Sequence, residues 1–205
     1  MNKQIMGVLA GTLAMLTGVP GLAALNVGAA APDFTATASQ AGKDFTFSLK
    51  QALAKGPVVV YFYPAAYTGG CDLEAHTFAT EKDKFTQAGA TIIGVSADSI
   101  ARLNQFSSDP KYCAGKFAVA SDPDGKIATR YDLKMMPPQK GVTDVQGKPV
   151  THGFFPRTTF VIDREGKIVA TLSSQQDHLT PDQHVMQSLA IVERMHSGKA
   201  PQAGQ

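Results

Sequence analysis

The sequence predicts one α/β domain in which helices cover both faces of a mixed β-sheet. Segments with strand periodicity alternate with segments of helical periodicity, and this order is typical of a sheet between two helical layers. The runs 58–63 and 91–96 are almost continuously apolar, as expected of central strands buried on both faces. Two late strand patterns flank a turn at 163–166, and this hairpin makes the sheet mixed.

The N-terminal part predicts a β-hairpin that extends the sheet. Residues 35–39 and 45–48 have strand character and are separated by Gly42 and Lys43. A short helix over 49–55 follows and ends at Gly56. The strand over 58–63 comes next and ends at Pro64, ahead of a turn-rich loop over 65–70.

The middle of the chain predicts a helix, a strand and a second helix. Over 71–88, Ala75, Phe78 and Phe85 share one face, and Gly89 ends the helix. After the strand over 91–96, Asp98 or Ser99 can cap a helix that runs to about residue 107.

The last third completes the alternation. The remaining predicted elements are a strand over 117–120, a turn over 122–125, a short helix over 126–131, a loop over 135–151, a hairpin formed by 157–162 and 167–172, and a final helix that starts at Thr180 or Asp182 and stops at Gly198.

The first residues predict an export signal. Lys3 is followed by an apolar or small run over 5–19 and by small residues near position 23, the pattern of a cleaved secretory signal peptide. We therefore expect a signal peptide at 1–23, one domain at 24–197 and a flexible tail at 198–205. The mature protein would be periplasmic or secreted, without stable membrane insertion. An uncleaved N-terminal anchor is the alternative.

Charge and histidine placement exclude two functional classes. The chain has 19 Lys and Arg against 17 Asp and Glu, with no basic run, whereas nucleic-acid binding needs clustered positive charge. The five histidines are scattered, so the sequence predicts no metal site and no cofactor.

Cys71 is the residue most suited to chemistry. The chain has two cysteines, too few for a disulfide scaffold. Cys71 follows the loop after a buried strand and begins a predicted helix. Free backbone N–H groups and the helix dipole at such a position favour a thiolate, the nucleophilic form.

Cys71 closes a P-x-x-x-T-x-x-C motif that starts at Pro64. With the segments at 31–34, 121–125 and 157–167, this motif resembles the peroxiredoxin family, and most of all its bacterioferritin-comigratory or Q-type branch. The resemblance implies a thioredoxin-like three-layer fold. It also implies thiol-dependent reduction of hydrogen peroxide and organic hydroperoxides, an external dithiol reductant, and a monomer or weak homodimer.

The resemblance also assigns roles. Cys71 matches the peroxidatic cysteine, which becomes a sulfenic acid. Thr68 matches the threonine that bridges thiolate and peroxide, and Pro64 the proline that shields the pocket. Arg157 matches the arginine that holds the thiolate and polarises the peroxide. Taken singly, Pro64, Thr68 and Arg157 also suit ordinary turns and strand ends.

Other positions vary or depart from the family pattern. Glu74 matches a residue that often bonds the active-site arginine, although a solvated surface role is the alternative. Gly69 stands where a proline is usual. His76 replaces the second cysteine of many Q-type members. Cys113 is then the candidate resolving cysteine that would form an intramolecular disulfide, with an idle thiol and an external resolver as the alternative.

Two rival functions use related folds. An exported thioredoxin-like thiol-disulfide oxidoreductase would normally carry C-x-x-C, and Glu74 stands where its second cysteine would be. A non-enzymatic metal-delivery protein would need a further cysteine near Cys71, and Ala75 is not one.

Overall fold

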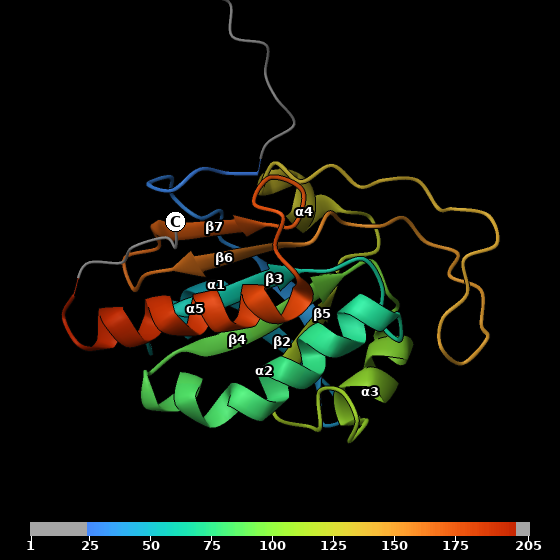
Figure 1. Ribbon diagram of the computed structural model, residues 1–205, viewed down its shortest axis with the longest axis horizontal. Coiled ribbons are helices and arrows are strands. Elements are labelled where there is room, and N and C mark those ends of the chain that lie inside the picture. The colour runs from blue at the N-terminus through green and yellow to red at the C-terminus, as the bar shows by residue number, and fades with distance from the viewer. Residues whose placement is uncertain (1–23, 200–205) are drawn as a thin grey trace, which may run out of the picture.

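The computed structural model describes residues 24–199. The predicted signal peptide at 1–23 and the end of the predicted tail, 200–205, lie outside the described residues. Within that range a seven-stranded sheet has the order β2-β1-β5-β4-β3-β6-β7 and lies between helices (Figure 1).

The centre of the sheet is mixed, as predicted. β3 (Val58–Phe62) pairs in parallel with β4 (Thr91–Ser96) and antiparallel with β6 (Thr158–Ile162). Further out, β5 (Ala118–Ser121) is parallel to β4, and β7 (Ile168–Ser173) is antiparallel to β6. The predicted N-terminal hairpin, β1 (Thr35–Gln40) with β2 (Lys43–Ser48), extends the β5 edge.

Helices cover both faces of the sheet, which confirms the three-layer prediction. On one face lie α2 (Gly69–Gln87), α3 (Ile100–Ser108) and α5 (Pro181–His196), in front of the sheet in Figure 1. They share a core with Val59 and Tyr61 of β3. The other face carries α1 (Leu49–Leu53) and α4 (Lys126–Arg130), which share a second core with Val58, Val60 and Phe62. Because successive side chains of β3 point to opposite faces of the sheet, this strand contributes residues to both cores.

The ring of Tyr61 in β3 packs directly against Gly94 in the neighbouring strand β4. Tyr61 stacks on Phe78 of α2, with ring centroids 4.6 Å apart. Gly94 is paired opposite Tyr61, and a Cβ built at Gly94 would lie only 2.6 Å from the tyrosine ring. A glycine in this strand is therefore required by the close approach of the ring.

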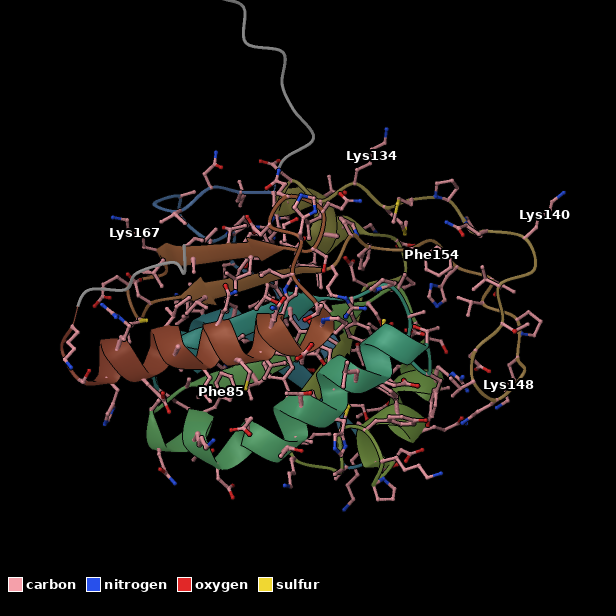
Figure 2. All side chains as sticks on the ribbon, in the orientation of Figure 1. Phe85, Lys134, Lys140, Lys148, Phe154 and Lys167 are labelled. Carbon is pink, nitrogen blue, oxygen red and sulfur yellow. The ribbon has the colours of Figure 1, made fainter. Side chains whose placement is uncertain are left out.

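The start of α2 differs from the sequence-based expectation. α2 begins at Gly69, two residues earlier than predicted, so Thr68 is the N-cap and Cys71 is the third helical residue. The loop between α4 and β6 extends well beyond the sheet, and Lys140 and Lys148 lie along it in Figure 2. No helix within residues 24–199 is long and apolar enough to cross a membrane.

Candidate active site

Cys71 lies in the first turn of α2, at the end of the loop that leaves β3. Its side chain is 3% exposed. The first backbone N–H groups of a helix have no partner within the helix. The strand–loop–helix sequence therefore delivers a buried sulfur to a helix N-terminus, as predicted.

Arg157 bridges Cys71 and Glu74. Its Nη2 donates to the Cys71 Sγ at 3.2 Å, and its Nη1 donates to Oε2 of Glu74. Arg157 immediately precedes β6, which is paired with β3, and this pairing brings the guanidinium to the start of α2. Glu74 is completely buried, so the surface alternative for this residue is wrong.

Opposing influences set the protonation of these groups. Burial raises the pKa of Cys71, while Arg157, the backbone N–H of Ala65 and the hydroxyl of Thr68 lower it. The helix start is expected to favour the thiolate, whereas desolvation of the buried sulfur acts against it and is the largest influence on this pKa. Burial also raises the pKa of Glu74 to about 7 against the lowering effect of Arg157.

The loop before Cys71 has a defined backbone. The Thr68 hydroxyl donates to the Ala65 carbonyl at 2.8 Å. The Ala66 N–H donates to Oδ2 of Asp98 at 2.8 Å. Pro64, at the end of β3, is half-buried. The structure therefore brings Thr68, Arg157 and Glu74 to Cys71, and the loop that begins at Pro64 leads directly to it.

Cys113 lies in the turn region between α3 and β5 and is fully buried. Both cysteines are free. Polar contacts fasten the Cys113 region to α2: His76 Nδ1 donates to the Lys111 carbonyl at 3.0 Å, and Lys116 Nζ donates to the Ala79 carbonyl at 2.9 Å. Burial, followed by Asp109 and Asp72, raises the pKa of Cys113 well above its ordinary value.

Three polar residues near this site were not singled out as functional by the sequence. The sequence predicts Asp98 only as a helix cap, suggests that His152 could line the pocket because it precedes the segment of Arg157, and gives His184 no motif. Asp98 carried one usable signal, since it follows the carboxyl end of a central strand, where α/β sheets place their functional groups. For His152 the one signal is its position shortly before Arg157, and His184 carries none, because the hydrogen-bond partners that define each histidine are distant in sequence or lie on other elements.

His184 of α5 lies behind Arg157 in a buried network. Its Nδ1 lies 3.0 Å from the Thr159 hydroxyl, and its Nε2 lies 2.9 Å from the Ser174 hydroxyl. Ser174 donates its proton to the Leu179 carbonyl and therefore accepts from Nε2, which leaves Nδ1 to accept from Thr159. Burial and then Arg157 lower the pKa of His184 to about 4, so this ring is neutral.

Comparisons with known proteins agree with this architecture. Peroxiredoxin Q from Populus jackii chloroplasts is 33% identical over 175 residues, which is 84% of this chain and 70% of that protein. The crystal structure of the peroxidoxin BcpB from Mycobacterium tuberculosis superposes with a TM-score of 0.66 at 28% identity, over 82% of this chain and 96% of that one. The bacterioferritin comigratory protein of Xanthomonas campestris gives a TM-score of 0.61 at 26% identity, over 80% and 92%.

The sequence profile described as the AhpC/TSA family matches residues 27–171. This span includes β3, the Cys71 loop, α2 and Arg157. The relatives and the solved structures both confirm the resemblance to the Q-type branch and the thioredoxin-like fold. The chain therefore belongs to the AhpC/TSA family and is a peroxiredoxin, a thiol-dependent peroxidase.

Proposed function

We propose that Cys71 is the peroxidatic cysteine of this enzyme and that Arg157, Thr68 and Pro64 form its peroxide pocket. One observation carries the proposal: the Arg157 guanidinium lies 3.2 Å from the Cys71 sulfur and is held from its other side by buried Glu74. The guanidinium is permanently charged and has several N–H groups, so it can donate both to the sulfur and to the oxygens of a bound peroxide.

The reaction is a displacement at oxygen. The Cys71 sulfur attacks the nearer peroxide oxygen, and an S–O bond forms as the O–O bond breaks. The departing oxygen takes the O–O electron pair and the thiol proton, and leaves as water or, from an organic hydroperoxide, as an alcohol. Sulfur is oxidised to a sulfenic acid. Arg157 and the Ala65 N–H stabilise the negative charge that passes from sulfur to the departing oxygen.

Pro64 and the burial of Cys71 give the pocket its dry character. With the sulfur only 3% exposed, few waters reach it, and the donors around it act at low dielectric. The same burial raises the pKa of the thiol. A neutral peroxide enters such a site at less cost than an anion does.

This assignment is tested by the first turnover of the reduced protein. Cys71→Ser should consume no peroxide, whereas Cys113→Ser should consume about one equivalent as fast as the parent, since it keeps the site intact. Peroxide consumption by Cys71→Ser at the parental rate would overturn the assignment.

We also propose that Cys113 resolves the sulfenic acid. Its sulfur would attack the sulfur of Cys71, release water and leave an intramolecular disulfide, which an external dithiol then reduces by exchange. The contacts from α2 to Lys111 and from Lys116 to α2 lie between the Cys113 region and the helix that carries Cys71 in its first turn. Because Cys113 is fully buried, local opening must precede the attack.

Mass spectrometry after one equivalent of peroxide separates the two recycling routes. The proposal expects a Cys71–Cys113 disulfide in the parent and a persistent sulfenic acid in Cys113→Ser. A parent that accumulates sulfenic or sulfinic acid at Cys71 would instead support an external resolving thiol.

Export and assembly complete the proposal. The basic and apolar pattern of residues 1–23 supports a cleaved signal and a periplasmic or secreted enzyme, which N-terminal sequencing of the protein from fractionated cells would check. The family profile starts at residue 27, just after this segment. We propose a monomer or weak homodimer, to be measured by light scattering across a concentration series.

A further inference from the structure

A second segment of chain crosses the loop that carries the cysteine motif. Residues 63–68 are called the peroxidatic loop here, and residues 142–152 the crossing segment. The Val145 N–H donates to the Tyr67 carbonyl at 2.8 Å. At the far end of the crossing segment, His152 reaches Asp98, which in turn holds Ala66.

Asp98 is the centre of this arrangement. Its carboxylate is buried and accepts from three groups: the Ala66 N–H at 2.8 Å, the Ser96 hydroxyl at 2.8 Å and His152 Nε2 at 3.1 Å. A buried carboxylate is stable when opposite charge and several donors compensate it. Among these three partners only His152 can bring a charge.

The partners of His152 define its protonation. Nε2 faces the Asp98 carboxylate, and Nδ1 lies 2.8 Å from the Gly153 carbonyl. Both partner atoms are acceptors, and a neutral imidazole has a single N–H. Both ring nitrogens donate only in the imidazolium form. Burial opposes this charge, but the bonds to Asp98 and Gly153 outweigh it, so the pKa of His152 lies above its ordinary value.

The peroxidatic loop needs such an anchor. Tyr67 has a φ of 61°, a left-handed conformation that is unfavourable for a residue with a side chain. The Ala65–Ala66 peptide connects this anchor to the site, because its N–H donates to Asp98 and its carbonyl accepts from the Thr68 hydroxyl at 2.8 Å. A shift of this peptide would therefore displace the Thr68 hydroxyl, which lowers the pKa of Cys71.

We propose that Asp98 and His152 are positioning residues of the peroxidase: protonated His152 fixes Asp98, Asp98 holds the N–H of the Ala65–Ala66 peptide, and the carbonyl of that peptide holds the Thr68 hydroxyl at the start of α2, which carries Cys71. Loss of the His152 proton loosens the loop and slows the reaction with peroxide. The inference rests on the proposed role of Cys71.

Other charged or titratable groups also lie around His152. Arg102 of α3 is paired with Asp144 of the crossing segment, and together with Lys148 they line the cavity of about 690 Å³ that His152 also faces. Tyr63 lies near Asp98, and burial followed by Asp98 raises its pKa well above the ordinary value. Burial raises the pKa of Tyr67, which packs under Arg102, to about 12.

The test compares second-order rate constants for hydrogen peroxide across pH. The proteins are the reduced full chain, His152→Gln, and the control His196→Gln, which alters an exposed histidine of α5. Glutamine keeps one donor toward Asp98 but cannot become charged. The ionisation of Cys71 is common to all three proteins, so the ratio of parent to variant rates removes it.

We expect the parent to exceed His152→Gln roughly 10-fold at about pH 6, the size of losing one charge-assisted hydrogen bond, with the ratio falling toward one above about pH 9. His196→Gln should stay at a ratio of one. Asp98→Asn should be slow at every pH, because an amide cannot accept from all three donors.

Two outcomes overturn the inference: a His152→Gln rate equal to that of the parent, or a ratio that is constant across pH, which would indicate a purely structural role. If Asp98→Asn does not fold, the His152→Gln profile alone decides. The Cys71→Ser experiment distinguishes failure of the proposed role of Cys71 from failure of the positioning role of Asp98 and His152. An active Cys71→Ser refutes the proposed site, whereas an inactive one with a constant ratio refutes only the positioning pair.

Discussion

The neutral, buried His184 makes the protein sensitive to mild acid. His184 is completely buried, and its two ring nitrogens bond to Thr159 and Ser174 in a pattern in which Nδ1 already accepts from Thr159, so a second N–H would require the Thr159 hydroxyl to turn its own proton away. Burial and Arg157 lower its pKa from 6.5 to about 4. Protonation therefore requires either a strained network or unfolding.

The size of the effect follows from linkage. A histidine whose folded pKa is lowered contributes stability that is fully present above its unfolded pKa and is lost as pH falls toward the folded value. A change from 6.5 to about 4 corresponds to about 3 kcal/mol in total, of which about 2 kcal/mol is lost at about pH 5.

Urea unfolding followed by circular dichroism at about pH 7 and about pH 5 measures this loss. His184→Gln should be less stable than the parent at the higher pH, because its amide replaces only part of the network. Its disadvantage should shrink by about 2 kcal/mol at the lower pH, since glutamine does not titrate. His196→Gln, in the same helix but exposed, should follow the parent. Parallel curves for parent and His184→Gln would refute the argument.

Three further substitutions test separate parts of the site. Gly69→Pro should raise the free energy of unfolding by about 0.4–1 kcal/mol, measured by thermal or urea denaturation. Gly69 is the first helical residue, Thr68 before it is extended, and a Cβ at position 69 would meet no atom within 4 Å, so the proline ring fits. A loss of stability would show that the turn cannot accept the ring. Tyr112→Phe removes the hydroxyl that interacts with the Asp72 carboxylate and lowers its pKa, and it should speed disulfide formation about fivefold in quenched-flow mass spectrometry, as loosening by about 1 kcal/mol allows. An unchanged rate would place the barrier elsewhere. Glu74→Gln should lower the pKa of Cys71, measured from the pH dependence of its alkylation, because Glu74 raises that pKa; a rise would mean that Arg157 had lost its orientation.

The sequence by itself determined the elements and singled out Cys71 as the candidate reactive residue. The continuous apolar run at 58–63 can be satisfied only by burial on both faces, and it became the central strand. The motif from Pro64 to Cys71 marked the turn into α2 correctly to within two residues. These features are local, since hydrophobic periodicity and turn chemistry act between near neighbours in the chain.

Only the tertiary structure decided what surrounds the sulfur. Arg157 lies 86 residues from Cys71 and reaches it because β6 pairs with β3. His152 is 54 residues from Asp98, and burial of Glu74 depends on the same packing. Such contacts follow from strand order and from how loops cross, which periodicity does not encode. The pKa of Cys71 shows the consequence: the local helix start favours the thiolate, whereas the burial imposed by the fold has the larger and opposite effect.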